Sequence, residues 1–387
     1  MLALAAGLVI TILLLGSTTR ERDAKQLALD ESNDVTEFFS EMLTSTSPDI
    51  GNKDMSVREM LDQTAKTIGD RFGDRPLLEA RIRRTMGETY VSLGEFDEAA
   101  VELQSAIDLM EKAPDSLPAN LLGARVKLGE VHALNADYDT AFSVLDAALA
   151  DAPDTPELEL PRARAVVARA ATLSRLGQLD EAQQQLEAIE KQLTKQHDPA
   201  NETLLAAKAE LALIALTRGD VRAEAMYEEL IAIAITAFGD EHPRTLGYTG
   251  NLGAFLRDQG RNADAVPVFR QVYQGQSKVL GPAHRQTLIS ANNLAQVLAR
   301  SGEIEEAKSV LNEAIEVSNR EHGEDSATAL FLMYTLGGVL HQAGELDEAE
   351  RAMVRSVEAH RRIQGPEAEG TFHAERNLLG LYYAQEE

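Results

Sequence analysis

A glycine recurs at a fixed spacing of 42 residues through the last third of the chain. Seven residues after each glycine, an apolar residue opens a helical pattern. The glycines are Gly239, Gly281, Gly323 and Gly365, and the apolar residues are Leu246, Leu288, Leu330 and Phe372. A strict period of this length marks a repeat array, whose units bury their apolar faces only by stacking on neighbours. Because the apolar spacing within a period is i, i+3, i+4 and i+7, each unit is expected to be two helices. We therefore predict an all-α solenoid.

Five positions in each of three units resemble the tetratricopeptide repeat. In that family, helix A carries Leu-Gly or Leu-Ala and a bulky residue three positions on. A glycine ends helix A, and a small residue opens helix B. These roles fall on Leu252, Gly253, Leu256, Gly260 and Ala265, on Leu294, Ala295, Leu298, Gly302 and Ala307, and on Leu336, Gly337, Leu340, Gly344 and Ala349. The period and the entry from His242 to Leu246 resemble the kinesin-light-chain variety. The resemblance implies a superhelical solenoid over residues 77–387, with about seven helical pairs and a capping helix.

Earlier units keep this pattern less strictly. Ala136 stands at the turn-glycine position of the second unit, and Arg169-Ala170 replaces Leu-Gly in the third. Helix B of the fourth unit fits only if one residue is deleted, which gives Ala223, Tyr227 and Leu230. We expect a kink or a structural junction at this fourth unit.

Residues 1–16 contain no charged side chain. A membrane-spanning helix needs about 20 apolar residues, whereas a secretory signal has a basic start and a small-residue cleavage site. Because this run lacks both signal features and begins at Met1, we predict a retained, truncated membrane anchor. A cleaved signal and a buried helix are the alternatives. The basic residues between Arg20 and Lys25 weakly favour the cytoplasm for the segment that follows the anchor.

Residues 17–76 are predicted to be juxtamembrane helices and a linker. A helical pattern covers residues 20–43, and Ser56 with Glu59 forms a capping box for a helix that ends near Phe72. Together with the span and the repeats, this layout resembles the C-terminal half of bacterial membrane-anchored serine/threonine kinases, in which a kinase domain precedes the span. That resemblance implies a single-pass protein with its repeats on the non-cytoplasmic side, against the charge argument.

The formal charge of −26 comes from 63 acidic and 37 basic residues. Such a surface repels phosphate backbones, so we expect no nucleic-acid partner, and it favours basic or neutral peptides. An acidic surface that is simply solvated is the alternative. The absence of cysteine excludes disulfides and cysteine-ligated zinc.

The chain lacks the common catalytic motifs, and its carboxylates are spread along the predicted helix surfaces. We therefore expect no buried carboxylate or histidine cluster, no cofactor, no metal and no enzymatic activity. An enzyme of unknown class would need such a cluster. His242 and His284 share a repeat phase between units, where a capping or packing role is expected. Gly87, Gly253 and Gly337 are interpreted as points of close helix packing.

The resemblance implies that helix A lines a groove for an extended peptide or a partner helix. Asn251, Asn293 and Asn377 hold the same inner position of helix A in successive units, and Thr335 replaces asparagine at this position in one unit. An amide can pair with a peptide backbone, or it can bond neighbouring helices. The other predicted groove residues are Arg257, Gln296, Arg300, Tyr334, His341 and Gln342. The arginines would recognise acidic groups. The sequence thus predicts a membrane-anchored protein-interaction scaffold. The rival is the sensory half of a receptor-type kinase whose catalytic domain is missing from this chain.

Overall fold

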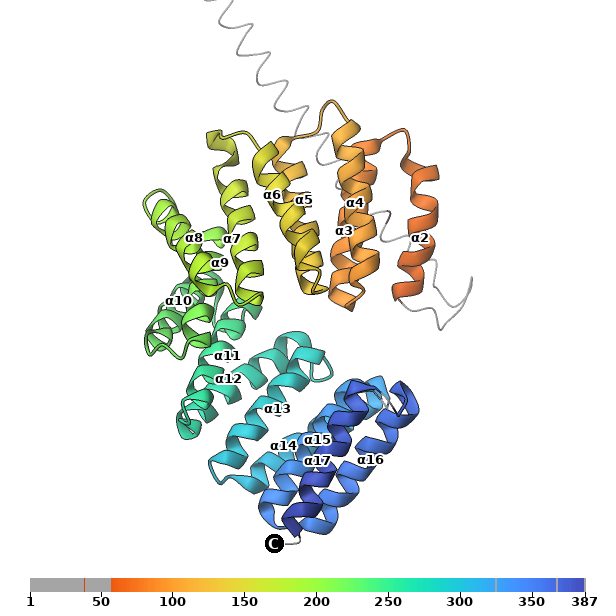
Figure 1. Cartoon of the computed structure of the whole chain (residues 1–387), viewed down its shortest axis with the longest axis vertical. Coiled ribbons are helices and arrows are strands. Elements are labelled where there is room, and N and C mark those ends of the chain that lie inside the picture. Colours follow the sequence, from red (N-terminus) through yellow and green to blue (C-terminus); the bar gives the residue numbers. More distant parts are fainter. Residues whose placement is uncertain (1–37, 39–56, 324–325, 367, 386–387) are drawn as a thin grey trace, which may run out of the picture. The chain divides into compact units, whose positions relative to one another are not determined.

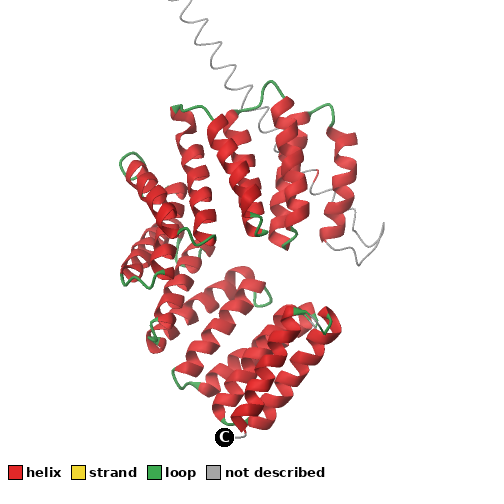
Figure 2. Cartoon of the chain, in the orientation of Figure 1, coloured by secondary structure: helices red, strands yellow, loops and turns green. Residues whose placement is uncertain are grey.

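The computed structural model describes residues 38, 57–323, 326–366 and 368–385. Within these residues the chain forms sixteen α-helices, one short 3₁₀ helix and no strand (Figures 1 and 2). The all-helical prediction is confirmed. The chain divides into two compact units, Met1–Gln185 and Leu186–Glu387, and the boundary falls inside one helix, α8.

Both units are built from antiparallel helical pairs. In the first unit the elements are α2 (Val57–Phe72), α3 (Pro76–Leu93), α4 (Phe96–Lys112), α5 (Pro118–Leu134), α6 (Tyr138–Asp151), η1 (Pro156–Leu158), α7 (Glu159–Arg175) and the start of α8 (Leu179–Leu193). In the second they are α9 (Glu202–Thr217), α10 (Arg222–Phe238), α11 (Pro243–Asp258), α12 (Asn262–Leu280), α13 (Arg285–Arg300), α14 (Ile304–His322), α15 (Ala327–Ala343), α16 (Leu346–Gln364) and α17 (Glu369–Gln385). From α3 onward, odd-numbered helices take the place of helix A and even-numbered helices that of helix B.

A left-handed residue ends almost every helix A. Glycine holds this position in six pairs, with φ between 66° and 90°, because a residue without Cβ adopts positive φ without strain. In the second pair the residue is Ala136, with φ of 60°. Ala136 therefore keeps the turn that the repeat requires, but in a conformation that is unfavourable for a side chain.

Helices A and B cross closely at a small residue, as the sequence indicated. A Cβ added to Gly87 would lie 2.8 Å from Leu103 Cγ, and one added to Gly337 would lie 2.8 Å from Met353 Cγ. At Gly253 the nearest atom, in the Phe269 ring, would be 3.0 Å away. Because a real Cβ does not approach another atom at 2.8 Å, these glycines are fixed by packing.

The irregular fourth pair also follows the prediction. The sequence alignment of this unit, in which one residue is deleted, predicted Ala223, Tyr227 and Leu230 as the buried positions of its helix B. All three are buried in α10, so the predicted inner face is correct. The unit boundary falls in α8, one helix before this pair.

Near the N-terminus, the predicted helix ending at Phe72 is confirmed as α2. The Phe38 ring lies edge-on against Phe72, with centroids 5.4 Å apart. No helix among the described residues is long and apolar enough to cross a membrane. The expected anchor at 1–16, the capping residue Ser56, and residues 20–43 other than Phe38 lie outside the described part of the chain.

Candidate functional site

Helices α11, α13 and α15 each turn one stripe of side chains to solvent, at a spacing close to i, i+4, i+7 and i+11. We call these stripes the A face. It comprises Asn251 and Asp258 on α11, Ile289, Asn293, Gln296 and Arg300 on α13, and Phe331, Tyr334, Gly338 and Gln342 on α15. The helices α13 and α15 contact each other directly, so their stripes form one continuous surface.

The predicted groove residues fall on the A face or at its border. Asn251, Asn293, Gln296, Arg300, Tyr334 and Gln342 belong to it, and Arg257 and His341 are half-buried beside it. Asn377 lies in α17, but its side chain is outside the described part of the structure. The structure thus brings together the predicted residues of α13 and α15.

The recurrent asparagine position is not uniform. Asn251 is exposed, Asn293 is half-buried, and Thr335 is buried. Burial raises the pKa of Tyr227 on α10 to about 12, and the neighbouring Asn251 side chain acts on it in the opposite direction.

Two polar contacts join α13 to α15. The Thr335 hydroxyl donates to Asn292 Oδ1 at 2.6 Å, and Gln342 Nε2 donates to the Ala299 carbonyl at 2.8 Å. One amide donor of Gln342 is thus engaged in a hydrogen bond to the neighbouring repeat, although the residue is exposed. The buried amide on α13 is Asn292, one position before the predicted Asn293.

Sequence reasoning predicted Tyr334 but missed Ile289 and Phe331, the other two apolar residues of the A face. Ile289, Phe331 and Tyr334 are 36–43% exposed, although the helices that carry them are otherwise well buried. Ile289 and Phe331 occupy the same repeat phase, 42 residues apart. Both residues hold the repeat position of Gly247, which is exposed, and not that of its neighbour Leu246, which is buried. This position in the repeat could have identified Ile289 and Phe331 as exposed from the sequence.

The charge of these helices differs from that of the whole chain. Helices α11, α13 and α15 contain four arginines and one acidic residue, Asp258. Helix α14 alone contains five glutamates. Arg257 pairs with Asp258 at 2.9 Å, and Arg300 is exposed in the last turn of α13. The A face itself carries Arg300 and Asp258, so the net charge of the chain does not describe this surface. The expectation of a basic or neutral peptide partner, which was drawn from the net charge, stays a prediction.

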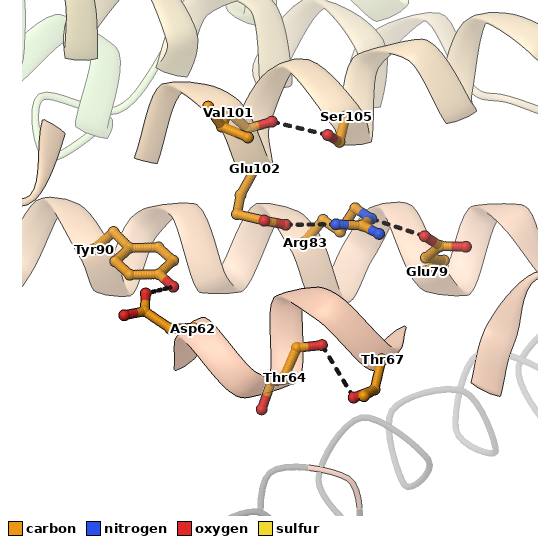
Figure 3. Close-up of polar contacts among 9 residues, drawn as sticks. All are labelled: Asp62, Thr64, Thr67, Glu79, Arg83, Tyr90, Val101, Glu102 and Ser105. Carbon is orange, nitrogen blue, oxygen red and sulfur yellow. Dashed lines mark hydrogen bonds and ion pairs between the residues drawn. The ribbon is translucent and has the colours of Figure 1, made fainter. Parts of the chain in front are cut away.

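A buried carboxylate cluster lies in the first unit, where none was expected. Arg83 on α3 contacts Glu79 and Glu102 at 2.8 Å each, and both glutamates are buried (Figure 3). Burial raises the pKa of Glu102, and Arg83 acts against that shift. The expectation failed because Glu79 and Glu102 lie on different helices and meet only in the fold.

This cluster is arranged for structure rather than for catalysis. Both carboxylates are occupied by Arg83, and Gly69 of α2 lies over Glu79. The Tyr90 hydroxyl donates to Asp62 of α2 at 2.8 Å, and burial raises the pKa of Tyr90 (Figure 3). A general acid or base needs access to a substrate proton, whereas both glutamates are buried and bound to a cation.

In other pairs, a basic residue of helix A bridges two helices B. Arg125 on α5 contacts Glu111 of α4 and Asp151 of α6, each at 2.8 Å. Arg169 on α7 contacts Asp146 of α6 and Glu181 of α8, and Lys208 on α9 contacts Glu190 of α8 and Glu229 of α10. Arg83 and Arg125 both stand four residues before the glycine at which helices A and B cross. Arg83 differs in that its partners are Glu79 on its own helix and Glu102 on α4, and both are buried.

The two histidines between repeats cap helices, as predicted. His242 Nδ1 accepts from the Arg244 backbone N–H, and His284 Nδ1 accepts from that of Gln286, both at 3.2 Å. Within the described residues, no group of three or more acidic or histidine side chains could hold a metal ion.

Three segments of the chain match models of the tetratricopeptide repeat: residues 245–320, 163–188 and 331–355. The chain therefore contains tetratricopeptide repeats. A search of curated proteins found no significant match.

Among solved structures, a kinesin light chain-like protein of Podosopora anserina with nearly identical TPR-like repeats is 24% identical, with a TM-score of 0.51 over 54% of this chain and 99% of that one. RapI in its apo form has a TM-score of 0.52 and 13% identity over 79% of this chain and 86% of its own. The apo quorum sensor NprR from B. thuringiensis has a TM-score of 0.50 and 15% identity, over 90% and 99%. These likenesses show that the fold is a TPR-like helical solenoid.

Proposed function

We propose that the A face binds a polypeptide that combines apolar and acidic side chains, and that the chain acts as a non-catalytic interaction scaffold. The observation that carries this proposal is the exposure of Ile289, Phe331 and Tyr334 on two helices in direct contact. A TPR-type helical repeat is a scaffold suited to protein interaction.

The apolar contacts would supply most of the affinity. Phe331 and Tyr334 lie three residues apart on α15, so their side chains are neighbours on one helix surface. Ile289 occupies the matching position on α13. Because each of these side chains is already more than half buried, covering its exposed part contributes roughly 1 kcal/mol. Clustered exposed apolar residues on an otherwise polar surface are typical of binding sites.

The amides and the arginine would select the partner. Asn293 and Gln296 offer donors and acceptors that can pair with a peptide backbone whatever its side chains. Arg300 can form charge-assisted hydrogen bonds with a carboxylate. Since α11, α13 and α15 together carry one acidic residue, an acidic segment approaches this face with little like-charge repulsion.

The membrane anchor and the link to a kinase remain predictions from the sequence. An immunoblot of the membrane fraction tests both. A band near 42.1 kDa would fit a free-standing anchored scaffold. A larger band would fit a chain that includes a kinase domain, and a protein found only in the soluble fraction would contradict the anchor.

The proposed binding is tested by selection from a displayed library of random peptides. Enrichment of sequences with aromatic or aliphatic residues next to Asp or Glu would support it. Enrichment of basic sequences, or no enrichment at all, would contradict it.

A further inference from the structure

Helix α7 of the first unit carries four arginines and a single acidic residue. Two of the arginines serve the packing of the repeats. Arg162 donates to two backbone carbonyls at the end of α6, and Arg169 bridges two helices B. The other two, Arg164 and Arg175, are exposed, and neither forms a hydrogen bond or an ion pair with a described residue. Helix α7 thus holds two cations that the described part of the fold does not use.

These two arginines lie on one side of α7. They are eleven residues apart, which is close to three full turns and about 16 Å along the helix axis. Ala168 and Ala171 lie between them on the same side, and both are buried. Two short side chains therefore form a low floor between two long cationic ones. We call this set the α7 stripe, and it consists of Arg164, Ala168, Ala171 and Arg175.

The α7 stripe holds the repeat positions of the A face, but it differs from that face in chemistry. Arg164 stands where α13 and α15 carry Ile289 and Phe331. Arg175 stands where α13 carries Arg300. The apolar contact of the A face is thus replaced by a second cation, so a partner of α7 would be recognised by its charge.

The charge around the α7 stripe is positive although the chain as a whole is acidic. Helices α5 and α7, which contact each other, contain six basic residues (Lys and Arg) and two acidic ones. One of these two carboxylates, Glu130, is paired with Lys127 at 2.9 Å. Helices α4 and α6 contain eight acidic residues and one basic residue. The negative charge of this unit therefore lies mostly on its helices B, and an anionic segment on α7 meets little local repulsion.

We propose that the α7 stripe is a second binding surface, which takes an extended acidic segment of a partner protein with two carboxylates about five residues apart. An extended chain advances about 3.3 Å per residue, so five residues span the distance between Arg164 and Arg175. Each guanidinium can form charge-assisted hydrogen bonds with one carboxylate. A nucleic acid fits this surface less well, because phosphate backbones are bound through many basic contacts and the stripe offers two.

Fluorescence anisotropy of a labelled peptide, titrated with the full chain, tests the proposal. The probe has two glutamates five positions apart, separated by serine and glycine, and it carries no apolar residue that the A face could bind. An isomer with adjacent glutamates has the same composition and charge. At low ionic strength the spaced peptide should bind severalfold more tightly than the isomer. Its affinity should fall as salt is added, because the contacts are exposed.

Arg164→Gln and Arg175→Gln should each weaken binding of the spaced peptide by about threefold to fivefold, as expected for an exposed charge pair. The double variant should bind the two peptides equally. Arg285→Gln is the matched control, because Arg285 on α13 is also exposed and also has no partner among the described residues. This control loses the same charge and should bind like the wild type. Circular dichroism should show equal helix content in all the variants.

Four results would overturn the proposal. They are equal affinity of the wild type for the two peptides, unchanged binding in the double variant, an equal loss in Arg285→Gln, and tighter binding of a single-stranded DNA oligonucleotide of the same length. A loss of the spaced peptide in Phe331→Ala would place it on the A face and would also contradict this site. The α7 stripe does not depend on the A face, so either proposal can fail without the other.

Discussion

The Thr335 hydroxyl donates a hydrogen bond of 2.6 Å to Asn292 Oδ1, and both side chains are buried between α13 and α15. This contact joins successive helices A directly beneath the exposed stripe formed by Asn293, Phe331 and Tyr334. The spacing between the two halves of the A face therefore depends on it.

Thr335→Val should loosen this junction. The substitution keeps the shape but leaves the Asn292 carbonyl buried without this donor, at a cost of about 1–3 kcal/mol. Native-state hydrogen exchange of the α13 and α15 amides would measure the loss locally. Asn293→Ala, at a half-buried position outside this contact, should change the exchange of the same amides by less than Thr335→Val does. Equal effects of the two substitutions would contradict the role given to the Thr335–Asn292 hydrogen bond in joining α13 and α15.

Ala136→Gly should stabilise the second helical pair. Ala136 has a φ of 60°, which costs an L-residue about 1–2 kcal/mol relative to glycine. The gain should appear as a higher thermal midpoint. Ala147→Gly, at an exposed position inside α6, should lower the midpoint instead, because glycine is a poor residue within a helix. A decrease in both variants would show that the turn at Ala136 is not strained.

Arg83→Met should lower the free energy of unfolding more than Arg125→Met does, although the two arginines hold the same repeat position. Removing Arg83 leaves Glu79 and Glu102 buried without their cation, which costs about 3–5 kcal/mol. The acidic partners of Arg125 are largely exposed, so its removal should cost about 1 kcal/mol. Urea unfolding followed by circular dichroism compares them. Similar losses would mean that burial does not determine the strength of these bridges.

Glu102→Gln should stabilise the protein most at neutral pH. The folded-state pKa of Glu102 is raised, so the folded chain binds this proton more readily than the unfolded chain. Its contribution to stability is present below the ordinary glutamate pKa and is lost as the pH rises through the raised value. The difference in thermal midpoint between the variant and the wild type should therefore shrink as the pH falls. A difference in thermal midpoint that grows as the pH falls would contradict a raised pKa of Glu102 in the folded state.

The sequence was sufficient for the helical pairs because glycine and small residues have strict steric roles in them. Gly253 and Gly337 were recognisable because a side chain at those crossings would press against Phe269 or Met353 of helix B. The charge bridges could not be read in the same way. Lys208 meets Glu190 and Glu229, and neither the spacing nor the residue type identifies these partners before the helices are packed.

The A face was only partly predictable for a related reason. Amides and arginines are normally exposed, so Asn293 and Arg300 were easy candidates. Phe331 and Ile289 are of types usually found in a core, and only their phase relative to Leu330 and Leu288 separates them from it. Asn292 and Thr335 are buried polar residues whose pairing required the contact between two repeats.

The most direct test of the account is the affinity of a selected peptide for the wild type and for Phe331→Ala, measured by fluorescence anisotropy. Val101→Ala is the control, because Val101 is an exposed apolar residue on α4 that does not belong to the A face. The account predicts a loss of about threefold to tenfold for Phe331→Ala, because the peptide covers only the exposed part of this side chain, and no loss for Val101→Ala. Unchanged affinity in Phe331→Ala would show that the A face is not the binding surface.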